Sequence, residues 1–155
     1  KKKLAKYSKT PGKTRQLNFF KLENKSDNLI LVDLPGYGFA KVSKKEQRDW
    51  KNLILNYLTN RRTLRTVCLL LDARREITIE DKKMIEFFDQ FGLSWTCIIT
   101  KIDKLTKNEI IRKIDEYKLF LKSKISVYPF LFSISSQKKI GLNELRAYIS
   151  TFVKN

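Results

Sequence analysis

One carboxylate stands where a short apolar run gives way to a turn that contains glycine. Residues 29–32 are apolar, Asp33 ends the run, and Leu34, Pro35 and Gly36 follow it. An aspartate at such a place can hold Mg²⁺, usually through a water, and the unobstructed glycine N–H lets a terminal phosphate approach. The pattern Asp-x-x-Gly is common by chance, and in the structural alternative Asp33 simply caps the turn.

A second polar group follows the apolar run at residues 94–100. It is the tetrad TKID, in which Thr100, Lys101 and Asp103 are the polar members. The Asp103 carboxylate can accept two parallel hydrogen bonds from the N1–H and the exocyclic amine of guanine, while the lysine stem lies over the base plane. Adenine would leave that carboxylate unpaired, which predicts guanine specificity. Taken alone, the tetrad also fits a charged surface turn.

Two further polar groups are weak signals by themselves. Ser135 and Ser136 follow the apolar run 127–133, and small residues there let backbone N–H groups reach a base carbonyl. Thr14 ends the segment TPGKT, and its hydroxyl can bind Mg²⁺. The order of the four groups, namely a threonine loop, DxxG, TKxD and a serine loop, is the order of guanine-nucleotide-binding domains.

The elements that must position these groups alternate between strand and helix. Short apolar runs predict buried strands at residues 29–33, 66–72, 94–100 and 127–133. A strand at residues 17–23 is expected to pair with the first of these, antiparallel, through a turn at 24–28. We therefore expect an α/β domain with a mostly parallel sheet, one antiparallel edge strand and helices on both faces. Ligands of such sheets bind beyond the carboxyl ends of the strands, where the polar groups stand.

Apolar residues at helical spacing predict four helices. Two of them follow potential capping boxes, formed by Ser43 with Glu46 and by Thr106 with Glu109. The apolar positions are Trp50, Leu53, Ile54, Tyr57 and Leu58 in the first helix, Met84, Phe88 and Phe91 in the second, Ile110, Ile114, Tyr117 and Leu121 in the third, and Leu142, Leu145, Ile149 and Phe152 in the last.

Composition limits the classes of function. The 155 residues suit one domain, and no apolar run approaches the length of a membrane span. With no histidine, a Ser-His-Asp triad and a histidine-ligated metal are excluded. Cys68 and Cys97 both lie in apolar runs, which predicts small buried thiols in a reducing, cytosol-like compartment.

The chain is strongly basic. Lys and Arg number 33 against 16 Asp and Glu, which gives a formal net charge of +17. Such a charge attracts polyanions, so RNA, ribosomes and acidic membrane surfaces are candidate partners. In the alternative interpretation, lysine only keeps the surface soluble.

With all four groups identified, the chain resembles the EngB GTPases, also called YihA or YsxC, a bacterial-type family of large-ribosomal-subunit assembly linked to cell division and septation. The stretches that carry the resemblance span nearly the whole chain: TPGKTRQLNFF, LVDLPGYGFAKVSKKEQRDW, LLLDARREIT, ITKIDKL and SSQKKIGLNEL. The resemblance implies a three-layer, Ras-like GTPase domain over residues 1–155. It implies GTP or GDP and Mg²⁺ as ligands, slow GTP hydrolysis, and RNA and proteins of the large ribosomal subunit as partners. We expect a monomer in a bacterial-type cytoplasm or in an organelle.

The resemblance also assigns roles to single residues. The expected catalytic residues are Thr14, in switch I, and Gly36, in switch II, and the expected Mg²⁺ ligands are Thr14 and Asp33. The expected nucleotide-binding residues are Asp33, Leu34, Pro35, Gly36, Thr100, Lys101, Asp103, Ser135 and Ser136. The family commonly has threonine where other GTPases have asparagine, so Thr100 fits its pattern.

Two features depart from GTPases in general. The phosphate-binding motif GxxxxGK[ST] is absent from the sequence, so we expect this loop and the strand that feeds it to precede Lys1. That strand would lie between the strands at 29–33 and 66–72, whose apolar edges are otherwise exposed. Tyr37 replaces the glutamine that positions the attacking water in Ras-like enzymes, which predicts slow hydrolysis.

Two other interpretations stay open at the level of sequence. The chain could be an RNA- or ribosome-docking module that no longer hydrolyses nucleotide, in line with its charge and the absent motif. It could also be a two-layer receiver-like domain that binds a metal through Asp33 and Asp72, although the TKID tetrad and the lack of a paired acidic cluster disfavour this.

Overall fold

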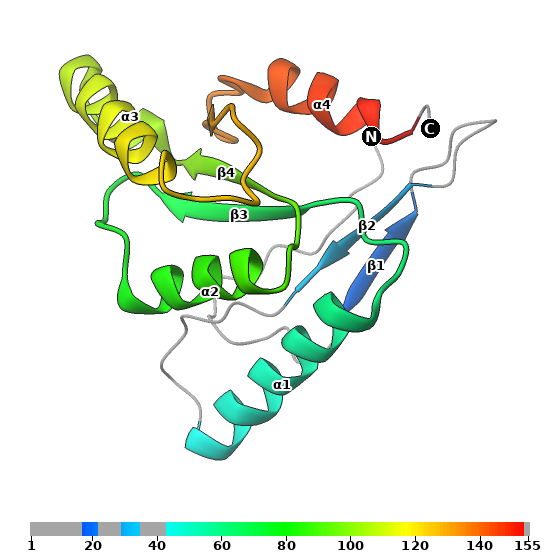
Figure 1. Cartoon of the computed structure of the whole chain (residues 1–155). Coiled ribbons are helices and arrows are strands. Elements are labelled where there is room, and N and C mark those ends of the chain that lie inside the picture. The colour runs from blue at the N-terminus through cyan, green and yellow to red at the C-terminus, as the bar shows by residue number, and fades with distance from the viewer. Residues whose placement is uncertain (1–16, 22–28, 35–42, 154–155) are drawn as a thin grey trace. The chain divides into compact units, whose positions relative to one another are not determined.

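The computed structural model describes residues 17–21, 29–34 and 43–153, and the statements below refer to these residues (Figure 1). The chain divides into two compact units, which are described separately. The first comprises Lys1–Arg62 with Val153–Asn155, and the second comprises Thr63–Phe152.

The first unit contains an antiparallel strand pair. Strands β1 (Asn18–Lys21) and β2 (Ile30–Asp33) pair in a register that sets Asn18 opposite Asp33 and Lys21 opposite Ile30. The predicted antiparallel pairing is confirmed for these residues, whereas residues 22 and 23 of the predicted strand lie outside the described ones. The predicted turn at residues 24–28 lies outside the described residues.

One long helix, α1 (Lys44–Asn60), completes the described part of the first unit. Its Ile54 and Leu58 are buried, as the helical spacing predicts. The ring of Tyr57 packs edge-on against Phe19 of β1, with 6.1 Å between ring centroids. The predicted capping box at its start involves the Glu46 side chain, which lies outside the described set.

The second unit is built on a parallel sheet. Its strands, in the order β3-β4-β5, are β3 (Val67–Asp72), β4 (Trp95–Thr100) and β5 (Phe132–Ser133). Between and after them lie α2 (Ile79–Gln90), the short 3₁₀ helix η1 (Ile102–Lys104), α3 (Lys107–Leu121) and α4 (Leu142–Thr151). The middle strand, β4, is buried along its whole length except for Thr100. The predicted α/β class and the parallel strands are thus confirmed.

Helices cover both faces of β4 (Figure 1). Successive side chains of a strand point to opposite faces, so Trp95 and Thr96 identify the two sides. The ring of Phe88 in α2 lies 5.8 Å from that of Trp95. On the other face, the hydroxyl of Tyr148 in α4 lies 2.5 Å from that of Thr96. The central strand is therefore enclosed between α2 and α4.

Both α2 and α3 begin with a reciprocal cap. Asp81 N–H donates to Thr78 Oγ1 at 3.1 Å, and Thr78 N–H donates back to the Asp81 carboxylate at 2.9 Å. Thr106 and Glu109 form the same arrangement at the start of α3, as predicted. Each box satisfies two backbone N–H groups that a helix start leaves without partners.

The predicted strand at residues 127–133 is largely wrong. Only Phe132 and Ser133 form a strand, and Val127 makes an isolated bridge to Trp95. Between these two contacts the segment contains more residues than the matching stretch of β4. The residues around Pro129 therefore do not pair with β4. Proline has no N–H to donate and interrupts a strand that its apolar neighbours would otherwise favour.

The outward face of β3 also differs from expectation. Cys68 is exposed, and Leu70 is 62% exposed, although the apolar run predicted burial on both faces. Among the described residues, β4 is the strand that pairs with β3, and no other strand pairs with its outer edge. Cys97, on the paired central strand, is fully buried as predicted, and burial raises the pKa of its thiol to about 12. Within the described residues, no helix is both long and apolar enough to cross a membrane.

Truncation of Phe88 tests the packing of α2 on the sheet. Phe88 is 1% exposed, so we expect Phe88→Ala to lower the free energy of unfolding of the full-length protein by about 3–5 kcal/mol, because it removes a buried ring and leaves a cavity. Urea denaturation gives this value. Phe91→Ala is the matched control, since Phe91 is 51% exposed at the end of the same helix. An equal loss in both variants would contradict the packing described here.

Candidate functional site

The loops that follow β4 and β5 are joined by two hydrogen bonds. Asp103 lies in η1, directly after β4, and Ser135 lies just after β5. Ser135 Oγ donates to Asp103 Oδ1 at 2.6 Å, and Ile102 N–H donates to the carbonyl of Ile134 at 3.3 Å. Because the carboxyl ends of parallel strands point the same way, two segments distant in sequence reach one place.

Ser135 is held rigidly in this position. The residue is fully buried, and its backbone exchanges two hydrogen bonds of 3.1 Å with Ile140. Its hydroxyl accepts a hydrogen bond from Lys138 N–H at 3.0 Å, which leaves the hydroxyl proton to donate to Asp103. Gly141 completes the turn with φ of +67°, and a Cβ there would lie 2.3 Å from the carbonyl oxygen of Ser133. The glycine is therefore required for the backbone to pass so closely.

Asp103 keeps one acceptor atom without a hydrogen-bond partner. Its side chain is 3% exposed, and its Oδ2 accepts no hydrogen bond from the described residues, although Lys104 Nζ lies 3.4 Å away. The hydrogen bond from Ser135, followed by the interaction with Lys104, lowers the pKa of Asp103 below its ordinary value. An ionised carboxylate with an unused lone pair can accept N–H donors from a ligand.

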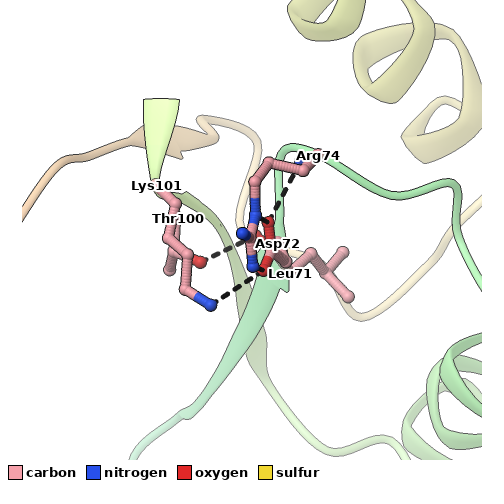
Figure 2. A network of polar contacts seen from close by, with 5 residues as sticks. All are labelled: Leu71, Asp72, Arg74, Thr100 and Lys101. Carbon is pink, nitrogen blue, oxygen red and sulfur yellow. Dashed lines mark hydrogen bonds and ion pairs between the residues drawn. The ribbon is translucent and has the colours of Figure 1, made fainter. Parts of the chain in front are cut away.

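Thr100 and Lys101 connect this loop to the end of β3. Thr100 Oγ1 donates to the carbonyl of Leu71 at 3.1 Å, and Lys101 Nζ lies 2.9 Å from Asp72 Oδ2 (Figure 2). Lys101 adopts left-handed backbone angles, with φ of 60° and ψ of 31°, a conformation that non-glycine residues adopt rarely. The chain thus turns sharply at Lys101, between β4 and η1.

The sequence analysis did not anticipate the contacts of Asp72. Its carboxylate pairs with the guanidinium of Arg74 through two contacts, of 2.9 and 2.7 Å, as well as with Lys101. These cations, with Arg74 first, lower the pKa of Asp72 far below its ordinary value. A signal was present in the sequence, because Asp72 ends a predicted strand just as Asp33 does. In the observed register, Asp72 lies opposite Thr100.

The remaining predicted residues fall into three groups. Thr14, Pro35 and Gly36 lie outside the described residues. Asp33 ends β2 and Leu34 follows it, both in the first unit, and their place beside Asp103 stays a prediction. Ser136 lies beside Ser135 and is exposed.

Binding of Mg²⁺ by Thr14 and Asp33 stays a prediction. The part of the chain that the structure describes holds no group of three or more acidic, cysteine or histidine side chains able to bind a metal. A closed protein cage is therefore absent from these residues. Asp33 is exposed at a strand end, and Mg²⁺ in nucleotide sites takes only one or two carboxylates and completes its shell with waters and phosphate oxygens.

The chain matches known proteins along most of its length. Residues 1–104 match the family model described as "50S ribosome-binding GTPase". The chain is 40% identical over 149 residues to the "Probable GTP-binding protein EngB" of Gluconobacter oxydans, with 96% of this chain and 64% of that protein covered. It is 46% identical over 146 residues to the protein of the same name from Clostridium beijerinckii, with 93% and 70% covered. The chain therefore spans about two thirds of the length of these relatives.

Solved structures share the fold. A crystal structure of a probable GTP-binding protein engB aligns with a TM-score of 0.71 at 19% identity, covering 95% of this chain and 87% of that one. The apo translation elongation factor SelB of Methanococcus maripaludis aligns with a TM-score of 0.67 at 24% identity, covering 88% of this chain and 27% of that one. At these identities the structures show the fold alone.

Removal of the Ser135 hydroxyl tests the pairing with Asp103. A depressed pKa means that ionised Asp103 stabilises the fold at neutral pH, and this contribution is lost as the pH falls through the folded-state pKa. In Ser135→Ala we expect the pKa of Asp103 to rise toward its ordinary value. The variant should therefore be less stable than the parent near neutral pH, and this part of the difference should vanish in acid.

Carboxyl ¹³C NMR titration and urea denaturation at several pH values measure the two effects. Ser136→Ala is the matched control, because Ser136 is exposed and adjacent. An unchanged pKa of Asp103 in Ser135→Ala would show that the hydrogen bond does not set its ionisation.

Proposed function

The chain belongs to the EngB family of GTP-binding proteins, and from this premise we propose that it binds GTP and GDP with Mg²⁺ and hydrolyses GTP slowly. In this proposal residues 1–155 form a single GTP-binding domain that lacks its phosphate-binding loop. The protein acts as a switch in assembly of the large ribosomal subunit, with the link to cell division and septation that the family resemblance implies.

The observation that carries the proposal is the unused acceptor of Asp103. Ser135 occupies Oδ1 and fixes the plane of the carboxylate, while Oδ2 has no hydrogen-bond partner among the described residues. Guanine offers two parallel N–H donors that satisfy such a group, whereas adenine offers no matching pair. The Asp103 side chain is nearly buried and its Oδ2 lies 3.4 Å from Lys104 Nζ, so the wrong base leaves this carboxylate without the two hydrogen bonds that guanine would supply. This asymmetry supports guanine as the base.

The phosphate end of the site is assigned by resemblance. Thr14 and Asp33 would hold Mg²⁺, and the Gly36 N–H would meet the terminal phosphate. Bound Mg²⁺ neutralises charge on the phosphates. Tyr37 stands where a glutamine would orient the attacking water, and its phenol does not replace an amide in that role. This substitution supports slow hydrolysis.

The exposed side of β3 supports a further strand in the complete fold. Its outer edge has no strand partner among the described residues. A strand paired there would satisfy the backbone groups of this edge. The resemblance assigns to this strand the loop GxxxxGK[ST], which residues 1–155 do not contain.

The basic surface supports the ribosomal part of the proposal. A net charge of +17 favours contact with RNA phosphates, and the matching family model is described as a 50S ribosome-binding GTPase. The same charge favours a second candidate function, an RNA-docking module without nucleotide turnover. The two candidates differ in whether guanine nucleotide binds and is hydrolysed.

Nucleotide competition distinguishes these candidates. We expect a fluorescent GDP analogue to bind the full-length protein and to be displaced by GTP but not by ATP. Asp103→Asn should weaken GDP binding about a hundredfold or more and shift preference toward xanthine nucleotides, because the amide reverses the donor pattern. Equal displacement by ATP would refute the role of Asp103. Absence of binding, together with retained RNA affinity, would favour the docking module.

Sedimentation with purified 50S subunits tests the ribosomal partner. We expect binding in the presence of a non-hydrolysable GTP analogue and weaker binding with GDP. Affinity should fall steeply as salt rises, since contacts to phosphates release counterions. Isolated 30S subunits are the control. Equal binding to both subunits would indicate a general attraction of the basic surface to RNA.

A further inference from the structure

Two cations from separate segments converge on the carboxylate at the end of β3. Asp72 is nearly buried, with 8% of its side chain exposed. Arg74 contacts both of its oxygens, and Lys101 Nζ lies 2.9 Å from Oδ2 (Figure 2). The bidentate contact with Arg74 fixes the plane of the carboxylate. Asp72 is therefore a rigid acceptor for the tip of the Lys101 side chain.

The backbone around this contact fixes its two ends relative to each other. Asp72 and Thr100 are partners in the parallel register, and Ala73 N–H donates to the carbonyl of Thr100 at 2.9 Å. Lys101 then turns through its left-handed conformation, and its carbonyl accepts from Lys104 N–H at 3.0 Å. With the backbone of Lys101 and the carboxylate of Asp72 both fixed, the ion pair limits the paths that the lysine stem can take.

This restriction has a use in the proposed site. Slightly more than half of the Lys101 side chain is exposed, and a free lysine would sample many rotamers there. In the proposed function, the stem of Lys101 lies over the base plane. Anchoring the ammonium before the ligand arrives removes part of the entropy that binding would otherwise cost.

We propose that Asp72 is a positioning residue for guanine binding, which acts by holding the Lys101 side chain in the orientation that covers the base. The inference rests on the proposed function and adds a residue to it. Asp72 itself does not touch the nucleotide in this arrangement, and base identity stays with Asp103.

Asp72→Asn gives an effect whose sign opposes that of general electrostatics. The substitution removes a negative charge, which by itself would strengthen binding of an anionic nucleotide. We expect GDP affinity to fall about two- to tenfold instead, as the lysine side chain regains its freedom. The preference for GDP over ADP should be retained, because Asp103 is intact. Collapse of the site would instead abolish both GDP binding and the preference for GDP over ADP.

A double-mutant cycle identifies the partner through which Asp72 acts. Lys101→Met keeps the aliphatic stem and removes the ammonium, so it should weaken GDP binding as much as Asp72→Asn does. The double variant should be no weaker than either single variant, since both break the same contact. Asp115→Asn is the matched control, because Asp115 is exposed on α3 and its loss changes the charge equally. It should leave GDP affinity unchanged or slightly stronger.

Titration of the fluorescent GDP analogue into each full-length variant measures these affinities, and thermal melting verifies folding. Unchanged or tighter binding in Asp72→Asn, or additive losses in the cycle, would overturn the inference while leaving guanine binding in place. If Asp72→Asn does not fold, Lys101→Met tests the inference instead, because Lys101 lies at an exposed position. A GDP affinity of Lys101→Met equal to that of the parent protein would overturn the inference. Absence of GDP binding by the parent protein would overturn the proposed function and this inference together.

Discussion

The pairing of β4 on both of its edges is the constraint on which the second unit depends. Backbone hydrogen bonds to β3 and β5 fix where each strand ends relative to its neighbours. The helices α2 and α4 enclose the two faces of β4. Because all three strands run the same way, the residues that follow them lie at the same end of the sheet, beyond the carboxyl ends of the strands. The contacts of Asp72 with Lys101 and of Ser135 with Asp103 both follow from that arrangement.

In the proposed function, these two contacts give the two carboxylates separate roles. Asp103 is oriented by a neutral hydroxyl, which occupies one of its oxygens and leaves the other without a hydrogen-bond partner among the described residues. Asp72 is saturated by cations, and its oxygens are both in use. The first arrangement suits direct contact with a ligand. The second suits support of a neighbouring side chain.

Much of the second unit could be predicted from local sequence, because local signals there agree with the tertiary fold. The apolar run around Cys97 predicted the central strand, and Thr106 with Glu109 predicted a helix start. The proximity of Asp103 to a serine loop followed from the expectation that both lie beyond the carboxyl ends of parallel strands. The ion pairs of Asp72 could not be predicted, since they depend on the exact register of β3 against β4 and on the rare backbone angles of Lys101. The sequence analysis missed the interruption at Pro129 because it gave more weight to the apolar residues around it than to the N–H group that proline lacks. The burial of Leu70 was misjudged because an apolar run does not reveal whether both faces of a strand are covered.

The outer side of β3 has a consequence for handling this protein in isolation. Among the described residues no strand pairs with the outer edge of β3, and unpaired backbone groups near an exposed leucine and an exposed thiol are a template for strands of other molecules. The second unit prepared on its own should therefore self-associate through this edge. Oxidation of Cys68 would link the associated molecules by disulfide bonds. A reductant would prevent the disulfide bonds, and a strand bound to the outer edge of β3 would prevent the association.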